Sequence, residues 1–357
     1  MRASPSVLSL IVFVAGCTTA AGPVTTVPVA TTQSPNSTVA PSTEATTSTT
    51  TTAVPGTTKA PSPELALYAV AEERSQRIAL FMETNAPGCA DEQRAPCGPF
   101  ELSARIDLPH RPHNMTAAGP VLWVTHPSAG MVTRIDLTGI SMVTQPLGNE
   151  PHDVKLSPEA DLLYVADEDG RVLIVADPAT LVELDRVELP AKPHDLAVDA
   201  VGGVWITLIG DDRLARFRSG TLELLSTGRS PHDLIVSSDD RVWFSNWNSD
   251  VLSVYDPITG SVERAPAGVV EPHHFALDAD GGIWVSDNGG AAVVEFGDGR
   301  PTTIPVGPVP HHIALGDDIA IVAVSGSGQA VFIDGSGVIG RFDLSEGLHG
   351  AAVARLP

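Results

Sequence analysis

Basic residues are scarce in this chain of 357 residues. Lys and Arg together number 21 against 43 Asp and Glu, which gives a formal net charge of −22 at pH 7. A surface this acidic repels phosphate backbones, so we exclude nucleic acid as a partner. Neutral and cationic ligands remain compatible with the charge.

Long apolar runs are also lacking near the N-terminus. The apolar run over residues 7–14 is too short for a transmembrane helix, which needs about 20 apolar residues. Because Arg2 supplies a positive charge ahead of this run, the segment is typical of a targeting signal. We therefore expect the protein to leave the cytoplasm.

The apolar run ends in Val14-Ala15-Gly16-Cys17. This tetrapeptide resembles the lipobox of bacterial lipoproteins, although Val14 stands where Leu is usual. The resemblance implies a signal peptide over residues 1–16, acylation of Cys17 and a lipid anchor on the extracytoplasmic face of a bacterial cell membrane. An ordinary secretion signal with a chance cysteine is the alternative.

Only two further cysteines are present, Cys89 and Cys97, and they lie close together in a Gly/Pro-rich stretch. In the oxidising environment outside the cytoplasm, such a pair predicts a local disulfide. A catalytic or metal-binding thiol is the alternative.

Large apolar side chains are nearly absent from residues 17–62. Thr, Ser, Pro, Ala and Val dominate this segment, which therefore cannot build a core. We predict a disordered linker that holds a globular part, residues 63–357, away from the membrane.

The globular part contains an internal repeat. A histidine, usually after proline, precedes a short apolar run at intervals of 39, 42, 38, 41, 38 and 38 residues. These histidines are His113, His152, His194, His232, His273, His311 and His349. Periods near 40 with short alternating strands are typical of β-propeller blades of four strands each.

One repeat illustrates the strands. Residues 194–198, 204–208, 213–217 and 221–225 are rich in β-branched and aromatic residues, and Gly and Asp turns separate them. The second strand of five repeats carries an aromatic residue at a fixed offset, which we interpret as packing between blades. These aromatic residues are Trp123, Tyr164, Trp205, Trp243 and Trp284.

The two ends of the repeat region predict the number of blades. One strand follows His349, and three strands, at residues 65–71, 77–82 and 100–108, precede His113. Together they make a seventh blade that ties the termini together and leaves no open edge. We therefore predict an all-β, seven-bladed monomer with an insertion at residues 83–99. Six blades with loose end strands are the alternative.

Polar residues should converge on one face of the disc. In a blade, the innermost strand starts where the second strand ends, so the repeated histidines and nearby acids gather around the channel mouth. The second-strand ends carry His126, Asp167, Asn246 and Asp287, and acids and further histidines near the repeated histidines include Glu150, Asp153, Asp195, Asp233, Glu271, His274 and His312. A histidine repeated in every blade can instead be structural, with its ring bonded to the backbone of a neighbouring blade.

Residues 272–287 and 310–315 resemble repeats of the streptogramin B lyase (virginiamycin B lyase) family. That family is a seven-bladed propeller that opens a cyclic depsipeptide by Mg²⁺-dependent elimination. The resemblance implies that Glu271 and Asp287 hold Mg²⁺, that His273 is the base and that His232 orients the ester. The sequence has Asp287 where the family has Glu, which shortens the reach to a metal.

Two classes of function stay open. One is a lyase-like enzyme with Mg²⁺ at the channel mouth, where a neutral histidine is a suitable base. The other is a non-catalytic propeller that binds a small molecule or a protein at the cell surface, because propellers host many functions. A third reading is a transition-metal site, because imidazole suits Cu, Zn and Ni.

Overall fold

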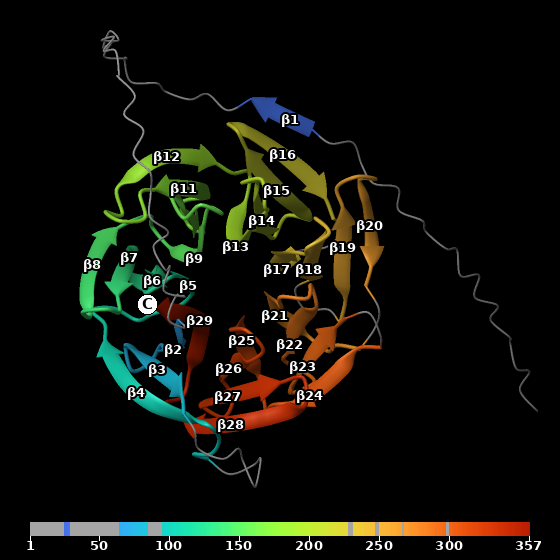
Figure 1. The fold of residues 1–357 in the computed structure, drawn as a ribbon. Coiled ribbons are helices and arrows are strands. Elements are labelled where there is room, and N and C mark those ends of the chain that lie inside the picture. The colour runs from blue at the N-terminus through green and yellow to red at the C-terminus, as the bar shows by residue number, and fades with distance from the viewer. Residues whose placement is uncertain are drawn as a thin grey trace, which may run out of the picture.

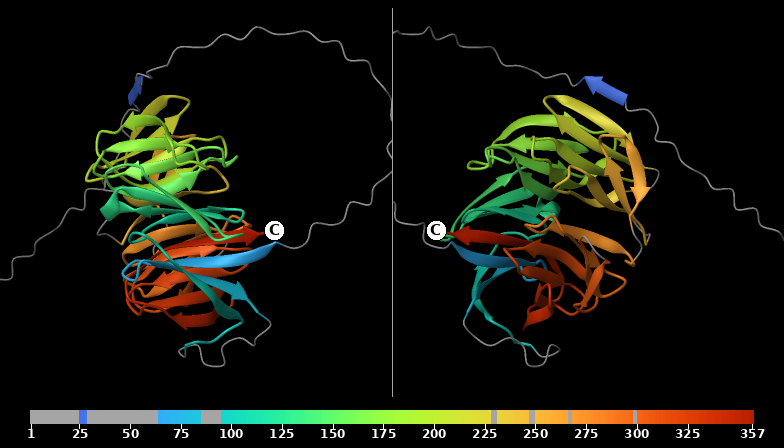
Figure 2. Two further views of the ribbon diagram at one scale, coloured as in Figure 1. Left: turned by 90° about the vertical axis from the view of Figure 1, so that its left-hand side faces the viewer. Right: turned by 45° about the vertical axis from the view of Figure 1, so that its right-hand side comes forward.

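The computed structural model describes residues 64–84, 95–227, 231–246, 250–265, 268–297 and 300–357, and the backbone of residues 25–28. In this part of the chain, seven antiparallel sheets are arranged around a common centre (Figure 1). The view turned by 90° shows the sheets arranged as a disc seen from its edge (Figure 2, left). The prediction of an all-β, seven-bladed propeller is confirmed.

Blades 1 to 6 follow one another along the chain, each from its innermost to its outermost strand. Blade 1 has β5 (Met115–Ala118), β6 (Val121–His126), β7 (Met131–Asp136) and β8 (Ser141–Pro146), with the short 3₁₀ helix η1 (Pro127–Ala129) after β6. Blade 2 has β9 (Pro151–Leu156), β10 (Leu163–Asp167), β11 (Val172–Ala176) and β12 (Glu183–Glu188). Blade 3 has β13 (Lys192–Val198), β14 (Val204–Ile209), β15 (Arg213–Arg218) and β16 (Thr221–Ser226).

The next three blades repeat the pattern. Blade 4 has β17 (Pro231–Val236), β18 (Val242–Asn246), β19 (Leu252–Asp256) and β20 (Ser261–Arg264). Blade 5 has β21 (Pro272–Leu277), β22 (Ile283–Asp287), β23 (Ala292–Phe296) and β24 (Thr302–Pro305). Blade 6 has β25 (Pro310–Leu315), β26 (Ala320–Val324), β27 (Gln329–Asp334) and β28 (Gly337–Asp343).

The seventh blade joins the two ends of the propeller. Its innermost strand is the C-terminal β29 (Leu348–Leu356), which is followed outward by β2 (Leu65–Glu72), β3 (Arg77–Glu83) and β4 (Phe100–Asp107). β29 pairs with β2 from Leu65↔Leu356 to Glu72↔Leu348. The ring is therefore closed by backbone hydrogen bonds between strands from opposite ends of the chain, as the sequence predicts.

The hydrophobic core is divided among the seven interfaces between blades. Each of seven buried clusters combines side chains of two neighbouring blades. The Trp123 indole of blade 1, for example, donates a 2.7 Å hydrogen bond to the Pro178 carbonyl of blade 2. Burial of apolar surface between blades thus holds the disc together, and the repeated aromatic residues contribute to it as predicted.

The predicted linker contains one described segment. Residues 25–28 form β1 (Thr25–Pro28), which pairs with β16 and adds a fifth strand to blade 3. The outermost strand of a blade has an open edge, and a segment of Thr and Val can pair with it. The remaining linker residues and the signal peptide, Cys17 included, lie outside the described residues.

The predicted insertion leaves β3 and returns beside blade 6. Cys97 exchanges two backbone hydrogen bonds with Arg341 of β28, of 2.9 and 3.0 Å. Cys97 is disulfide-bonded, whereas Cys89 lies outside the described residues. The pairing of Cys89 with Cys97 therefore stays a prediction. No helix in the described part of the chain is long and apolar enough to cross a membrane.

Candidate functional site at the channel mouth

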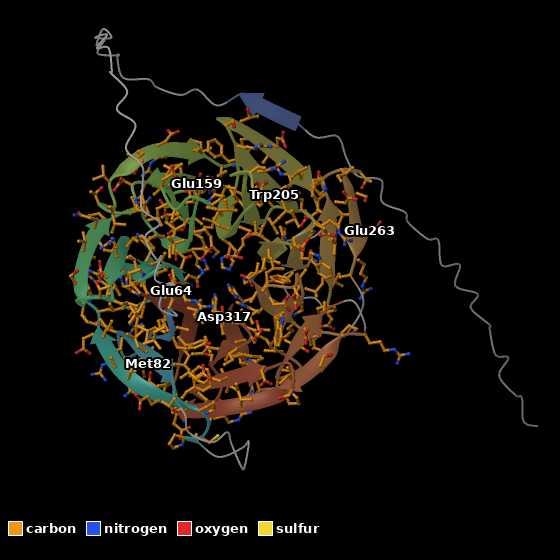
Figure 3. The ribbon with its side chains drawn as sticks, in the orientation of Figure 1. Glu64, Met82, Glu159, Trp205, Glu263 and Asp317 are labelled. Carbon is orange, nitrogen blue, oxygen red and sulfur yellow. The ribbon has the colours of Figure 1, made fainter. Side chains whose placement is uncertain are left out.

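The seven repeated histidines form a closed ring around the channel. The centroids of neighbouring imidazole rings lie between 3.5 Å, for His113 and His349, and 5.0 Å, for His232 and His273. The intermediate steps around the ring are 4.5, 3.8, 4.1, 4.1 and 4.2 Å. The side-chain view shows nitrogen atoms gathered around the centre of the disc (Figure 3). The predicted convergence of the histidines is thus present.

A β-bulge at the start of the innermost strand turns each histidine inward. In blades 3, 4 and 5 the pairing register with the second strand shifts directly after the proline, across the histidine. The residue before the proline has positive φ in blade 5, where Glu271 has a φ of 54°. Bulges re-aim side chains, so the Pro-His dipeptide directs the ring into the channel.

A hydroxyl on the second strand clamps this bulge. Thr207 accepts a 2.9 Å hydrogen bond from the Asp195 amide, and Ser286 accepts a 2.8 Å bond from the His274 amide. Ser286 also lies 2.9 Å from the carbonyl oxygen of His311 in the next blade, to which its hydroxyl donates. This role was not predicted, although Ser or Thr recurs in the sequence two residues after most of the aromatic markers.

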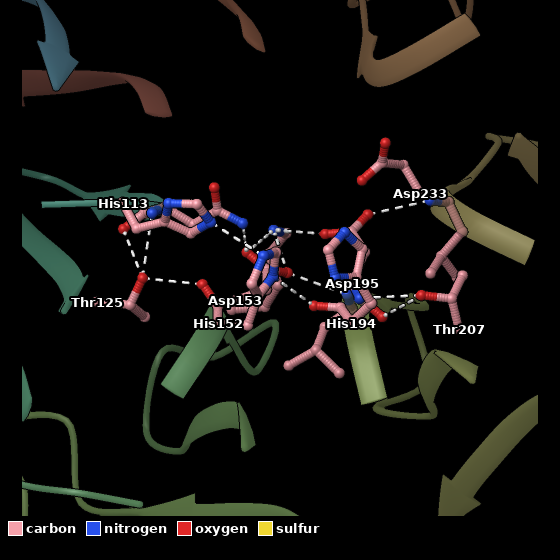
Figure 4. A network of polar contacts seen from close by, with 12 residues as sticks. His113, Thr125, His152, Asp153, His194, Asp195, Thr207 and Asp233 are labelled. Atoms are coloured by element: carbon pink, nitrogen blue, oxygen red, sulfur yellow. Dashed lines mark hydrogen bonds and ion pairs between the residues drawn. The ribbon is translucent and has the colours of Figure 1, made fainter. Parts of the chain in front are cut away.

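A second layer of polar side chains lies next to the ring, from the residues that follow the ring histidines (Figure 4). Asp153 accepts the Leu196 amide of the next blade at 3.0 Å, and Asp195 accepts the Leu234 amide likewise at 3.0 Å. Lys155 places its Nζ 2.7 Å from Asp153 Oδ2. This half of the second layer is therefore an ionic network, in which Lys155 was not predicted to take part.

The part of the ring in blades 2 and 3 is structural, as the alternative reading of the repeated histidines expects. His152 Nδ1 lies 3.0 Å from the His194 carbonyl oxygen, and His194 Nδ1 lies 2.6 Å from Glu168 Oε1. Burial is the main cause that raises the pKa of Glu168, to about 7. Hydrogen bonds between blades thus account for these rings without any ligand.

Burial lowers the pKa of most ring imidazoles, which keeps these neutral at physiological pH. It lowers the pKa of His152 to about 4, and neighbouring Asp153 only partly opposes it. Burial also lowers the pKa of His273, although Asp233 opposes it. For His349, burial and then the neighbouring His113 place the pKa well below its usual range. Neutral imidazoles can act as bases or metal ligands.

Three of the four predicted site residues line one cavity. His232, Glu271 and His273 surround a space of about 250 Å³ at the mouth, which Asn246 and His311 also line. The Nδ1 atom of His273 is buried and has no hydrogen-bond partner among the described residues. It lies 3.3 Å from Asp233 Oδ2, outside hydrogen-bonding geometry. We call this space the mouth cavity.

Asp287 takes a different position. It does not line the mouth cavity, and its Oδ1 accepts backbone hydrogen bonds from Val270 at 2.7 Å and Gly290 at 3.0 Å. Asp167, at the same place in blade 2, accepts the Glu150 amide at 2.8 Å in the same manner. Both carboxylates therefore organise the loop beside the innermost strand.

The donor set at the mouth cavity does not fit Mg²⁺. Mg²⁺ prefers carboxylate and water oxygens, and the described cavity lining offers one carboxylate, that of Glu271, among several imidazoles. The Asp287 carboxylate is engaged by the backbone. Clusters of histidines, two of them with a carboxylate, are present within the ring, but neither Glu271 nor Asp287 belongs to them. We derive no step through Mg²⁺.

Comparisons with known proteins agree with the fold and its repeats. No family model matches the chain. A virginiamycin B lyase of Nocardia farcinica is 26% identical over 153 residues, which are 42% of this chain. The match spans about half, 53%, of the length of that relative.

Solved structures share the propeller at low identity. Virginiamycin B lyase of Staphylococcus aureus superposes with a TM-score of 0.60 at 16% identity and covers 67% of this chain and 87% of its own. A protein of unknown function from Desulfotomaculum acetoxidans gives a TM-score of 0.63 at 14% identity, over 81% and 98% of the two chains. The chain therefore shares its propeller fold with virginiamycin B lyase and is similar to it over part of its sequence.

Proposed function

We propose that this protein binds a small ligand in the mouth cavity and removes a proton from it with His273, in an elimination of the lyase type. The observation that carries the proposal is the meeting of His232, Glu271 and His273 in one cavity. These are positions that the resemblance to the virginiamycin B lyase family implies for the site. The net charge of −22 favours a neutral or cationic ligand.

His273 has the properties that a base requires. Burial lowers the pKa of its imidazole, so the ring is neutral at physiological pH. Its buried Nδ1 lies 3.3 Å from Asp233 Oδ2, a neighbour that favours the proton on Nδ1 and leaves the other ring nitrogen unprotonated. A neutral imidazole with an unoccupied nitrogen can accept a proton from a bound ligand.

The elimination balances without water. His273 takes a proton from the carbon next to a carbonyl group, and the electron pair left behind forms a carbon–carbon double bond. The bond between the neighbouring carbon and the ester oxygen breaks, and the ester leaves as a carboxylate. His232, one blade away, would orient the ester, and Glu271 at the rim would attract a cationic group of the ligand.

Non-catalytic binding is the second candidate. The position of Asp287 favours it, because this residue does not line the mouth cavity and its Oδ1 accepts two backbone amides, which leaves Glu271 as the one carboxylate of the described lining. Under this reading the mouth cavity binds its ligand without opening it. The net charge again favours a neutral or cationic ligand, and the same residues of the mouth cavity would contact it.

The place of action is proposed from the N-terminal sequence. The lipobox-like Cys17 would anchor the chain in the outer leaflet of the cytoplasmic membrane, and the Thr/Ser/Pro-rich segment would give the propeller reach. The mouth cavity would then meet ligands that arrive from outside the cell.

The first test uses quinupristin, which is bound by a catalytically inactive His-to-Ala variant of the Staphylococcus aureus lyase. Binding to the purified chain is measured by calorimetry, and ring opening by chromatography with mass detection. We expect His273→Ala to lose opening, whereas His152→Ala, a ring variant outside the mouth cavity, keeps it. Binding without opening would favour the second candidate, and the absence of both would contradict the proposal.

A further inference from the structure

Three histidines of blades 6 and 7 form a cluster of imidazoles alone. His311 and His312 are consecutive residues of β25, and His349 belongs to the neighbouring β29. One ligand nitrogen from each lies within 4.8 Å of the other two. The three rings line a central cavity of about 140 Å³ inside the histidine ring.

The distances within this cluster are close to those of a metal site. The Nδ1 atoms of His311 and His312 are 3.0 Å apart. Two nitrogens that bind one Zn²⁺ at 2.0–2.1 Å are separated by about 2.9–3.4 Å for bond angles between a right angle and a tetrahedral one. The two rings are therefore already at the spacing of a chelate.

The third ring is near and its nitrogen is available. The His349 ring centroid lies 4.2 Å from that of His311 and 4.5 Å from that of His312. Its Nδ1 is buried and has no hydrogen-bond partner among the residues that the structure describes. A small rotation of the side chain would bring this nitrogen to a shared ion.

The other two clusters that could hold a metal are already held together by hydrogen bonds. His194 Nδ1 is bonded to Glu168 at 2.6 Å, and His152 Nδ1 to the His194 carbonyl at 3.0 Å. In the remaining cluster, His232 Nδ1 is bonded to Asp233 at 2.9 Å. A hydrogen bond also joins His311 and His312, but His349 adds a buried Nδ1 that has no partner among the described residues, so the cluster of blades 6 and 7 is the favourable one.

We propose that His311, His312 and His349 bind one divalent transition-metal ion of the Zn²⁺ class in the channel. Three neutral imidazoles with a fourth position open are a donor set that suits Zn²⁺, Cu²⁺, Ni²⁺ and Co²⁺ and does not suit Mg²⁺. On binding, the hydrogen shared by His311 and His312 moves to the outer nitrogen of its ring, so no proton needs to leave. Of the three proposed ligands only His311 also lines the mouth cavity, although the central cavity shares His232 and His273 with it as well.

The test titrates the full chain, purified without a histidine tag and treated with a chelator, with Zn²⁺ in a calorimeter. We expect one Zn²⁺ per chain, a rise in Tm with Zn²⁺, and visible absorption of low-symmetry Co²⁺ when Co²⁺ is used instead. Excess Mg²⁺ should not displace either ion.

Matched variants locate the ion. His312→Gln and His349→Gln should each weaken Zn²⁺ binding by about tenfold or more, because even indirect partners of a metal contribute that much. His194→Gln, which removes a histidine shared by both other clusters, should bind Zn²⁺ as the wild type does. Circular dichroism of the metal-free variants shows whether each is folded.

Three results would overturn the proposal. The first is the absence of stoichiometric Zn²⁺ binding by the wild type, together with an unchanged Tm. The second is wild-type affinity in a folded His312→Gln or His349→Gln variant. The third is an equal loss in His194→Gln, which would move the ion to another part of the ring. The Tm and the Co²⁺ spectrum are measured on the wild type. They therefore test whether the chain binds a metal even if a substitution prevents folding.

Discussion

Acidification should destabilise the propeller because its channel is lined with buried neutral imidazoles. Eight histidines in and next to the ring have a pKa that burial lowers below the ordinary value of 6.5. They are His113, His152, His194, His273, His274, His311, His312 and His349. In the unfolded chain each would titrate near 6.5, so the unfolded state binds more protons below that pH.

The sign follows from the lowered pKa. The stability that the neutral imidazoles contribute is present above pH 6.5 and is lost as the pH falls toward the folded pKa, which is about 4 for His152 and His274. Between about pH 7.5 and about pH 5.5, each such histidine costs at most about 1.3 kcal/mol of unfolding free energy. Eight histidines give an upper bound of about 10 kcal/mol.

Buried carboxyl groups oppose this loss. The pKa of Glu168 is raised to about 7, chiefly by burial, so the folded protein takes up a proton there and recovers about 2 kcal/mol over the same range. Burial also raises the pKa of Asp195 well above its ordinary value. After the contribution of Glu168 is subtracted, the upper bound on the loss is about 8 kcal/mol. We halve this value because water penetrates the site, and we expect a net loss of about 4 kcal/mol of unfolding free energy. That is a large part of the stability of an ordinary domain.

The assay is guanidinium unfolding of the metal-free chain, followed by tryptophan fluorescence, at both pH values. His152→Gln should reduce the pH-dependent loss by about 1 kcal/mol. His110→Gln, which removes a histidine outside the ring, is the comparison variant. An unfolding free energy that stays constant or rises on acidification would refute the description of the ring as buried and neutral.

Three further predictions concern the anchor, the ring closure and Asp287. Cys17→Ala should move the protein from the membrane fraction to the soluble fraction, and an unchanged membrane fraction on cell fractionation would contradict the lipid anchor. Deletion of residues 349–357 should lower the Tm of the whole domain in one transition, because β29 pairs with β2 and buries Ala351, Ala352 and Ala354. A truncated domain with the Tm of the wild type would argue against closure by β29. Asp287→Ala and Asp167→Ala should each cost about 1–3 kcal/mol in denaturant unfolding, because both remove a buried acceptor of backbone amides. A much smaller loss of unfolding free energy for Asp287→Ala than for Asp167→Ala would favour a role of Asp287 in ligand or metal binding.

The fold could be predicted almost completely from the sequence. The period near 40 residues predicts the blades, and the unequal ends predict that β29 joins β2, β3 and β4. The alternation of apolar and polar residues and the turn residues are local sequence features, and they recur in each repeat. The pairing of β1 with β16 could not be predicted, because a Thr-rich segment carries no signal for which blade edge it meets.

The candidate site could be predicted only in part. The repeat predicts that His232, Glu271 and His273 meet, because each starts an innermost strand or precedes it. It does not predict that Asp287 is engaged by the Val270 and Gly290 amides, because those bonds depend on the local path of the loop. The reach of Lys155 across to Asp153 likewise depends on side-chain conformation rather than on spacing.

The most direct test of the proposed function is the fate of quinupristin in water labelled with heavy oxygen. Elimination by His273 yields an opened product with the mass of the cyclic compound and no label, since no water enters the balance. Hydrolysis would add one labelled water. We predict an unlabelled, isomeric product from the wild type and none from His273→Ala. A labelled product, or equal opening by the folded His273→Ala variant, would contradict the assignment of His273 as the base of an elimination.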